Sequence, residues 1–479
     1  MNKVIPISRS SSAISRNRSD EAIARLRQFL DNGGMPKRTG PKDFAEFERK
    51  LHERVMEVER EVIGEALSEA DIDAPAVTIE GRVHRKVLRS SETYMTAAGP
   101  VRVERTLYKD RTDARKKAIS AMDVRVGVVD GFWTPLAAKQ ASWIVAQMTP
   151  GKAEELLHRV GNMEPSKSSL DRLPKAVSEK WEAGREAFES VLRTGDEIPD
   201  DAVSVAVSLD GVMAPMEGTE KETKRRETAS QGRLTRGPAG YREVGCATLS
   251  FCDDKGDMIR AVRIARSPEE HKATLKVSLE AELSEALRKR PDLKVVKVAD
   301  GAKDNWTFLS ERLPDGPNIL DFFHGAEHLH TALAEAYGDG TVKARARFAE
   351  LREILLDGDN GVENVIRALA YLRKEHPTNK ILERELKYFR AHRHNMHYWK
   401  WREQGLPVGS GVVEAACKSL VTQRLKLSGM MWSEEGAQSI ITLRGWDQSD
   451  RFDRAWALVA ATWQSEVTTV QPAPPLRAV

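Results

Sequence analysis

The fold of this chain is decided by two similar segments, Val203-Ser-Val-Ala-Val-Ser-Leu-Asp-Gly211 and Leu293-Lys-Val-Val-Lys-Val-Ala-Asp-Gly301. Each is an apolar run of strand length that ends in Asp-Gly. A single Asp-Gly after a strand is usually only a turn, because both residues favour turns. If the two strands are parallel neighbours, Asp210 and Asp300 emerge at the same edge of one sheet. Two adjacent carboxylates repel each other, so the pair predicts a site for a hard divalent ion such as Mg²⁺.

The elements around these two strands alternate in the way that is typical of an α/β sheet. Between residues 202 and 324 the order is β-β-β-α-β-α-β. The first of the two segments is followed by a hairpin and a capped helix, and the second by a helix and a last strand. The expected bounds are Val244–Cys252 and Met258–Ile264 for the hairpin, a capping box at Ser267–Glu270 with a helix to about Arg290, a helix over Asn305–Leu313, and a strand over Asn318–Phe323 that ends at His324.

A third carboxylate that would complete the site follows much later in the chain. In Gly409-Ser-Gly-Val-Val-Glu-Ala-Ala-Cys-Lys418 a glycine loop leads into a helix and places Glu414 about one turn in. Lys418 lies one turn further on the same face. The separation between Asp300 and Glu414 is too long for the helix that follows the last core strand. We therefore expect residues 326–408, which are mostly helical in pattern, to be an insertion.

Together these segments resemble the DDE-type transposases with a ribonuclease H-like core, most closely the ISKra4 insertion-sequence family. The resemblance covers residues 40 to 447 and rests on five segments in the family's order: Val207–Met213, Val298–Trp306, Asp321-Phe-Phe-His324, Gly409–Glu414 and Gln423–Gly429. It implies that Asp210, Asp300 and Glu414 form a catalytic triad that holds two Mg²⁺ or Mn²⁺ ions. It also implies a place for His324 near the active site. Many members carry paired cysteines after the early strands, and because none stand there in this chain, no zinc is expected.

The remainder of the chain divides by composition and by the period of its apolar residues. The expected regions are a basic arm and amphipathic helix (1–75), a small antiparallel β unit (76–112), a helical DNA-binding region with a candidate helix-turn-helix (113–198), the ribonuclease H-like catalytic core (199–325 and 409–447), the helical insertion (326–408), and a C-terminal helix with a disordered tail (448–479). The chain is therefore expected to be a multi-domain protein.

Cationic and aromatic side chains in three segments are candidates for DNA contact. The first segment is a pair of helices that matches the outline of a helix-turn-helix, an outline that ordinary helical hairpins share. The second interleaves tryptophans with cations, as strand-binding surfaces do, although core packing explains the same pattern. The third follows the last carboxylate of the site. The candidates are Lys167, Arg172, Trp399, Trp401, Lys418, Arg424 and Lys426.

A competing enzyme class is indicated by His324-Gly-Ala-Glu-His328, which fits the H-x-x-E-H signature of inverted zinc peptidases. That chemistry needs both histidines and the glutamate to face one metal from a helix. We expect His324 at the end of a strand, with Gly325 weakening the first turn of the helix after it. The peptidase hypothesis also leaves the two Asp-Gly strand ends unexplained, so it ranks below the transposase.

Composition limits the class of protein further. A chain of 479 residues exceeds one compact core, and 75 Lys and Arg against 72 Asp and Glu exclude a uniformly basic surface. Three cysteines without a C-x-x-C pair indicate a reducing compartment. No apolar run approaches the roughly 18 residues of a membrane helix, and no signal peptide is recognisable. We expect a cytoplasmic, nucleoid-associated protein with no membrane partner.

These observations predict a DNA transposase with an α/β ribonuclease H-like core. It would bind the terminal repeats of its insertion sequence, cleave DNA and join 3′ ends to target DNA by two-metal phosphoryl transfer. Its partners would be double-stranded DNA, at the element ends and at the target, and further copies of itself in a homodimer or larger assembly. Two alternatives stay open: a catalytically inactive, domesticated DNA-binding protein, and a structure-selective DNA nuclease.

Overall fold

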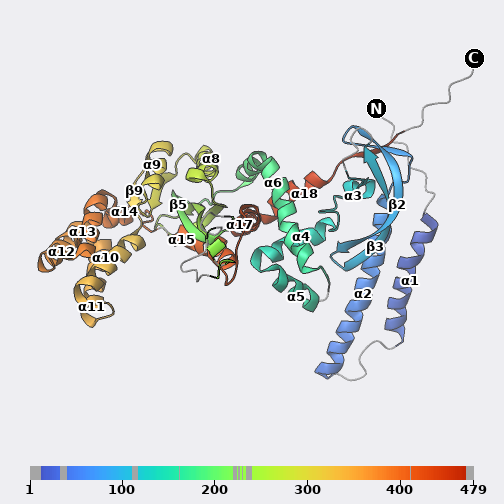
Figure 1. Cartoon of the computed structure of the whole chain (residues 1–479), viewed down its shortest axis with the longest axis horizontal. Helices are drawn as coiled ribbons and strands as arrows, with labels where there is room; N and C mark the ends of the chain where they lie inside the picture. The colour runs from blue at the N-terminus through green and yellow to red at the C-terminus, as the bar shows by residue number, and fades with distance from the viewer. Residues whose placement is uncertain are drawn as a thin grey trace, which may run out of the picture. The chain divides into compact units, whose positions relative to one another are not determined.

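The computed structural model of the chain describes residues 12–32, 40–110, 117–160, 162–218, 224, 227–228, 230–232, 240–409 and 411–470. By their internal contacts the residues form two compact units (Figure 1). One comprises residues 1–183 with 453–479, and the other comprises residues 184–452. Among the described residues, no helix combines the length and apolar character needed to cross a bilayer. The tail after residue 470, which was expected to be disordered, lies outside the described residues.

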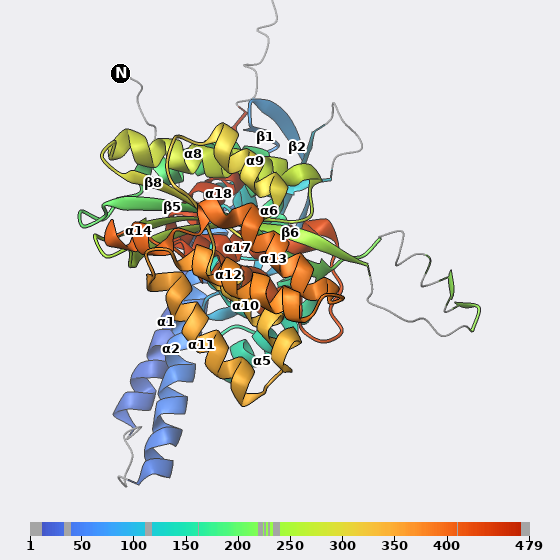
Figure 2. The ribbon, with the colours of Figure 1, turned by 90° about the vertical axis from the view of Figure 1, so that its left-hand side faces the viewer.

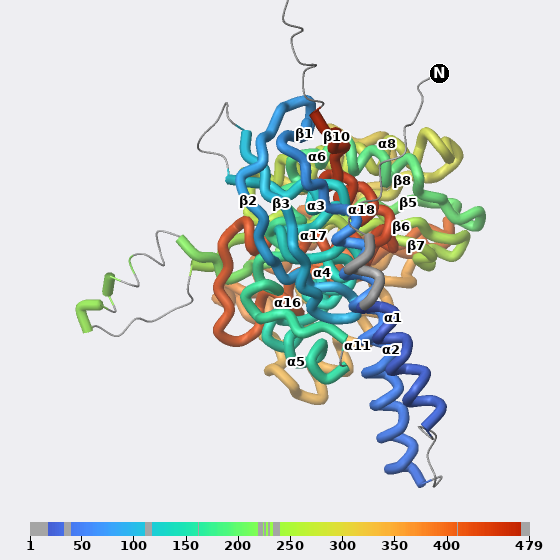
Figure 3. Tube along the Cα trace, turned by 90° about the vertical axis from the view of Figure 1, so that its right-hand side faces the viewer, coloured from blue at the N-terminus to red at the C-terminus, as the bar shows by residue number. Residues whose placement is uncertain are grey.

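The first unit combines two long helices with an antiparallel sheet (Figure 3). The helices are α1 (Ser12–Asp31) and α2 (Pro41–Ala70), and the sheet order is β10 (Val467–Thr469), β1 (Ala76–Ile79), β2 (Arg82–Thr96), β3 (Gly99–Asp110) and β4 (Ile119–Ser120). The expected amphipathic helix and the antiparallel pairing of β1, β2 and β3 are confirmed. The strand β10 was not anticipated, because it comes from the far end of the chain and pairs with β1.

Several further helices follow this sheet along the chain. They are α3 (Ala121–Val126), α4 (Pro135–Gln147), α5 (Pro150–Val160), α6 (Lys167–Gly195) and, near the C-terminus, α18 (Phe452–Ala460). Ser166 opens α6, because its hydroxyl accepts the backbone N–H of Ser169 at 3.2 Å. The helix is 29 residues long and contains Pro174. The assignment of α5 and α6 to a helix-turn-helix stays a prediction.

The second unit is built on a mixed five-stranded sheet whose order is β7-β6-β5-β8-β9. Its strands are β5 (Ser204–Pro215), β6 (Tyr241–Cys252), β7 (Met258–Arg266), β8 (Lys294–Ala299) and β9 (Asn318–Leu320). The first three strands are antiparallel, whereas β5, β8 and β9 run parallel to one another. The helices α8 (Ala273–Lys289) and α9 (Lys303–Arg312) connect them. The predicted order of elements is therefore confirmed.

Two predicted boundaries in this unit are wrong. The strand β5 does not end at Asp210, because β6 continues to pair with it as far as Pro215. The capping box at Ser267–Glu270 does not open the next helix either. His271 and Lys272 adopt left-handed backbone conformations, with φ of 52° and 54°, so α8 starts only at Ala273. The side chain of Glu269 accepts the N–H of Leu275 at 2.9 Å and caps the helix from further away.

The last strand of the sheet is shorter than predicted. It ends at Leu320, and the carboxylate of Asp321 accepts the N–H of Phe323 at 3.1 Å, which caps α10 (Phe322–Tyr337). His324 consequently lies in the first turn of a helix and not at the end of a strand. Both histidines of the H-x-x-E-H sequence therefore lie on α10. The expected position of His324 at the end of a strand no longer counts against the peptidase hypothesis.

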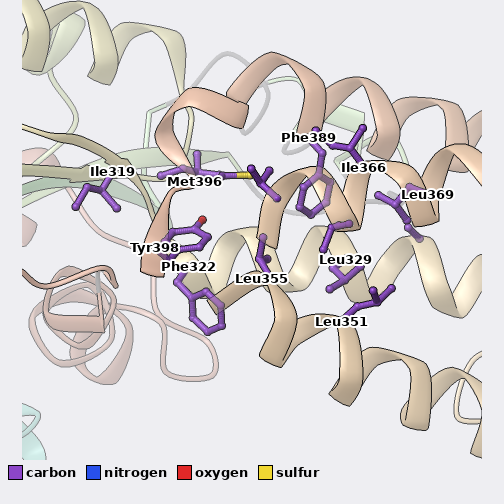
Figure 4. Packing of buried hydrophobic residues seen from close by; sticks show 14 of the residues in the cluster. Ile319, Phe322, Leu329, Leu351, Leu355, Ile366, Leu369, Phe389, Met396 and Tyr398 are labelled. Carbon is purple, nitrogen blue, oxygen red and sulfur yellow. The ribbon is translucent and has the colours of Figure 1, made fainter. Parts of the chain in front are cut away.

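One face of the sheet is covered by the helices after β9. They are α10, α11 (Val342–Asp357), α12 (Gly361–Glu375), α13 (Lys380–His392) and α14 (Tyr398–Glu403), which lie together in Figure 2. Their apolar residues form one core with Ala206 of β5 and with Val296 and Val298 of β8. Figure 4 shows this packing around Leu329 and Phe389. The opposite face, with Val207 and Leu209, packs on α8 and α9.

A second group of helices covers another part of the first face. It comprises α15 (Gly411–Ala416), a π-helix η3 (Cys417–Thr422), α16 (Gln423–Leu425) and α17 (Glu434–Gln448). Ala214 of β5 and Val244 and Cys246 of β6 belong to this core. Successive residues of a strand alternate between faces, so Ala206, Asp210 and Ala214 share one face. Asp210 therefore lies along β5 between the part covered by the insertion and the part covered by α15.

The packing of the helical insertion yields a stability prediction. Leu329 is fully buried in its core. Leu329→Ala should lower the free energy of unfolding of this unit by about 2 to 5 kcal/mol, because it removes apolar contacts and leaves a cavity. Urea unfolding followed by tryptophan fluorescence measures the change. Val342→Ala on α11, where the side chain is exposed, serves as the control, and equal effects of the two substitutions would contradict the described packing.

Candidate active site

Three aspartates lie at the same edge of the sheet, Asp210 within β5 and Asp300 and Asp321 directly after β8 and β9. Ser208 of β5 pairs with Val298 of β8, so Asp210 and Asp300 are each two residues further along adjacent strands. Ala299 of β8 pairs with Leu320 of β9, which places Asp321 next to Asp300. The N–H of Asp321 donates to the carbonyl of Ala299 at 2.9 Å. The parallel register thus gathers all three carboxylates at one edge.

Asp210 is held from its own strand and from the α15 segment. Its Oδ1 accepts the N–H of Gly211 at 2.6 Å, and the Cys417 thiol lies 3.5 Å from its Oδ2. Burial raises the pKa of Asp210, and repulsion from Asp300 adds to the rise, while the bonds from Gly211 and Cys417 oppose it. Cys417 is itself buried and shares a hydrogen bond with Cys246, which raises the pKa of its thiol and keeps it protonated.

Asp300 is held by the first turn of α9. Its Oδ1 accepts the N–H of Ala302 at 3.0 Å and lies 3.5 Å from Nδ2 of Asn305. Asn305 is only 2% exposed, and the same Nδ2 donates to the carbonyl of Leu209 at 3.1 Å. The side-chain amide of Asn305 therefore links the backbone of β5, one residue before Asp210, to the carboxylate of Asp300. Asn305 has a clear structural role that the sequence did not reveal, although it lies within the segment Val298–Trp306.

Glu414 reaches the site from α15 and pairs with Asp321. Asp321 is 1% exposed, and its side chain shares a hydrogen bond with Glu414. Glu414 is exposed, yet partial desolvation, this hydrogen bond and repulsion from Asp321, followed by repulsion from Glu327 and Asp210, raise its pKa to about 7. Two carboxyl groups share a hydrogen bond only when one of them carries a proton. The pair is therefore stabilised by a proton near neutral pH.

Asp210 lies close enough to the other two predicted carboxylates to interact with them electrostatically. Asp210 interacts with both Asp300 and Glu414, although Glu414 is turned toward Asp321. Within the described part of the chain, no three His, Cys, Asp or Glu side chains are already arranged to hold a metal ion. The site thus contains hard oxygen donors of the kind that Mg²⁺ prefers, with Glu414 engaged elsewhere.

A cluster of histidines lies on the helices next to this edge. The Nε2 atoms of His324 and His328 are 3.3 Å apart. The ring of Tyr388 stacks on His328 with centroids 3.7 Å apart, and its hydroxyl donates to the carbonyl oxygen of Asp300 at 3.2 Å. Burial lowers the pKa of His392, and the nearby rings of His328 and His324 lower it further. His324 is therefore joined to the carboxylate edge through Tyr388 and through its own place one turn after Asp321.

The predicted DNA contacts have different surroundings. Lys167, Arg172, Lys418 and Lys426 are exposed, and Trp399 and Trp401 are both half-buried. Trp401 packs against the core of the insertion, with Lys400 over its ring at 4.9 Å. Arg424 is 1% exposed and lies over the ring of Trp432 at 5.3 Å, a placement that does not support a DNA contact. Arg172 lies 3.4 Å from Asp130 of its own unit.

Comparisons with known proteins add only a remote structural likeness. No protein-family model matches the chain, and no curated protein matches it. Among solved structures, the Drosophila P element transposase strand transfer complex is similar to it, with 11% identity, over 69% of this chain and 81% of that chain, at a TM-score of 0.26. A TM-score this low does not establish a shared fold.

The raised pKa of Glu414 predicts how stability depends on pH. The folded protein holds the proton of Glu414 up to about pH 7, whereas an unfolded glutamate releases it near its ordinary value of 4.5. Between these two values the folded state binds more protons, so without metal the free energy of unfolding should fall as pH rises from about 5 to about 8. The raised pKa of Asp210 acts in the same direction.

Thermal unfolding in EDTA across that pH range tests this prediction. Glu414→Gln should flatten the dependence, because an amide keeps the hydrogen bond to Asp321 without titrating. Glu435→Gln, on the exposed surface of α17, should leave the slope unchanged. If stability fell with pH as steeply in Glu414→Gln as in the wild type, Glu414 and Asp321 would not share a proton.

Proposed function

We propose that this chain is a DDE-type DNA transposase whose second unit contains a ribonuclease H-like core. The observation that carries the proposal is the parallel register of β5, β8 and β9, which places Asp210 and Asp300 side by side with Glu414 in electrostatic reach. The element order of three antiparallel strands, then helix, strand, helix and strand, supports it. So does the helical insertion between the second and third carboxylates of the triad.

Asp210, Asp300 and Glu414 are the residues that would hold two Mg²⁺ or Mn²⁺ ions. Their chemistry fits such ions, because neighbouring carboxylates repel one another and a hard cation between them relieves the repulsion, which contributes to the raised pKa values of Asp210 and Glu414. When bound, the ions would activate an attacking oxygen and stabilise a leaving oxygen in phosphoryl transfer.

The residues of the chain itself orient these ligands. Asn305 and the N–H of Ala302 fix the carboxylate of Asp300, and the N–H of Gly211 fixes that of Asp210. Asp321 holds Glu414 and its proton in the absence of metal. Loss of that proton would free Glu414 for the ions, so binding of the ions should release a proton. His324, one turn after Asp321, would serve the reaction as a proton acceptor or donor.

DNA would reach this site from cationic and aromatic surfaces. Lys418, in the π-helix that follows Glu414, and Lys426 are exposed and suited to phosphate contact. Trp399, half-buried on α14, would stack on bases. Reading of the terminal repeats would belong to the first unit, with Lys167 and Arg172 on α6. Joining of two element ends would require at least a dimer.

A cleavage assay separates the transposase from its two alternatives. Purified protein, Mg²⁺, a labelled duplex that carries the element's terminal repeat and a supercoiled target plasmid are incubated together. The transposase should cut the duplex and join its 3′ end to the plasmid. Cutting without joining would indicate a structure-selective nuclease, and binding without cutting would indicate a domesticated DNA-binding protein.

Asp210→Asn tests the assignment of the triad in the same assay. The substitution removes the negative charge that a divalent ion needs, so cutting should fall by at least about 100-fold while binding to the duplex is retained. Asp254→Asn, at the exposed turn between β6 and β7, is the matched control and should cut normally. Undiminished cutting by Asp210→Asn would reject the assignment.

A further inference from the structure

A buried carboxylate lies behind the two histidines of α10. Glu385 of α13 has no exposed side-chain area, and one of its oxygens bonds to Nδ1 of His328. Its other oxygen accepts Nε of Arg384 at 2.7 Å. His328 in turn faces His324, with their Nε2 atoms 3.3 Å apart and their rings nearly perpendicular at 83°. Glu385, His328 and His324 therefore form one continuous chain of hydrogen bonds.

The chemistry of this chain favours one set of protonated nitrogen atoms when Glu385 is ionised and both rings are neutral. A carboxylate only accepts, so Nδ1 of His328 is the donor to Glu385. In a neutral ring the Nε2 of His328 then has a lone pair, and Nε2 of His324 must donate to it. The remaining nitrogen of His324, Nδ1, is left as an acceptor. The side chain of His324 is 34% exposed, so a substrate can reach this ring.

Other charged groups face the two rings from each neighbouring element. On α10, Oε2 of Glu327 lies 3.8 Å from Nδ1 of His324, and its side chain is mostly exposed. From α13, Tyr388 stacks on His328, and His392 lies close enough to interact with both histidines and with Asp300. The Tyr388 hydroxyl bonds to the Asp300 backbone. The chain of hydrogen bonds thus runs from a buried carboxylate toward the edge of the sheet that bears Asp300.

We propose that Glu385 and His328 are positioning residues, which hold His324 with its Nδ1 as a proton acceptor for the attacking oxygen. The inference depends on the phosphoryl-transfer function proposed above. As the oxygen of water, or of a DNA 3′-hydroxyl, forms its bond to phosphorus, its O–H bond breaks and the proton passes to Nδ1. The bond from phosphorus to the leaving oxygen breaks, and that oxygen keeps the electron pair. Glu385, acting through His328, stabilises the positive charge that His324 gains.

The protonation pattern is tested without any reaction. Full-length protein with ¹⁵N-labelled histidine is studied by ¹H–¹⁵N correlation NMR, with signals assigned from His324→Gln and His328→Gln. The proposal expects a proton on Nδ1 of His328 and on Nε2 of His324, and a change at both rings in Glu385→Gln. Glu383→Gln, an exposed neighbour on α13 that pairs with Arg373, should change neither. A proton on Nδ1 of His324 in the wild type, or His324 signals that Glu385→Gln leaves unchanged, would overturn the proposal.

The cleavage assay tests the consequence for the reaction. Glu385→Gln and His328→Phe should each lower kcat by about 10 to 100-fold with little change in KM, as loss of a group that orients a reacting residue does. In a His324→Ala background neither substitution should cost anything further, because both act through His324. An equal loss of kcat in both backgrounds would show that Glu385 and His328 only support the fold, and would overturn their positioning role.

The two measurements distinguish this inference from the proposed function. Wild-type protein that shows the expected protonation pattern but cuts no DNA would contradict the phosphoryl-transfer function and support the positioning of His324. Wild-type protein that cuts DNA but carries a proton on Nδ1 of His324 would contradict the positioning inference alone. Circular dichroism of each variant confirms that its helices are retained.

Discussion

Repulsion between carboxylates is the main constraint on the second unit. It arises because the parallel register of β5, β8 and β9 gathers Asp210, Asp300 and Asp321 at one edge of the sheet. Like charges at such a site oppose folding, and burial of the carboxylates adds to the cost. The structure offsets this cost locally. Backbone N–H groups of Gly211, Ala302 and Phe323 each donate to one of the three aspartates. Desolvation and repulsion between the carboxylates still raise the pKa values of Asp210 and Glu414.

The position of these carboxylates follows from how the sheet is covered. The helical insertion packs on one part of the face that bears Asp210, and the segment from α15 to α17 packs on another part. Both groups of helices contribute side chains to the site. The insertion provides His324 and Tyr388, and the segment from α15 to α17 provides Glu414 and Cys417. An insertion of this size is therefore part of the architecture of the site as well as a separate helical core.

Much of this arrangement could be predicted from the sequence because it depends on local patterns. Two apolar runs that end in Asp-Gly indicated adjacent carboxylates on the condition that the strands are parallel neighbours, and the order of elements followed from changes in apolar period. Glu414 was placed near the site by the glycine loop before it and by the family resemblance. Each of these motifs is local in the sequence, and their order along the chain supplied the rest.

The misplaced and missed features depend on contacts between distant segments. The strand β5 continues through Asp210 because β6 lies beside it, and no residue of β5 signals this. The left-handed conformations of His271 and Lys272 override a capping box that is intact in sequence. The buried Glu385 is one of two glutamates on α13, and its tertiary contact with His328 distinguishes it from Glu383. Asn305 likewise gains its role from Leu209, on a neighbouring strand.

The central claim is that Asp210, Asp300 and Glu414 share divalent ions. Crystals of the full chain with DNA and Mn²⁺, measured at the manganese absorption edge, test it most directly. The account predicts anomalous density between Asp210 and Asp300, with Glu414 released from Asp321 and within about 2.2 Å of a manganese ion, as expected for oxygen ligands. Manganese density elsewhere, with Glu414 still bonded to Asp321, would contradict it.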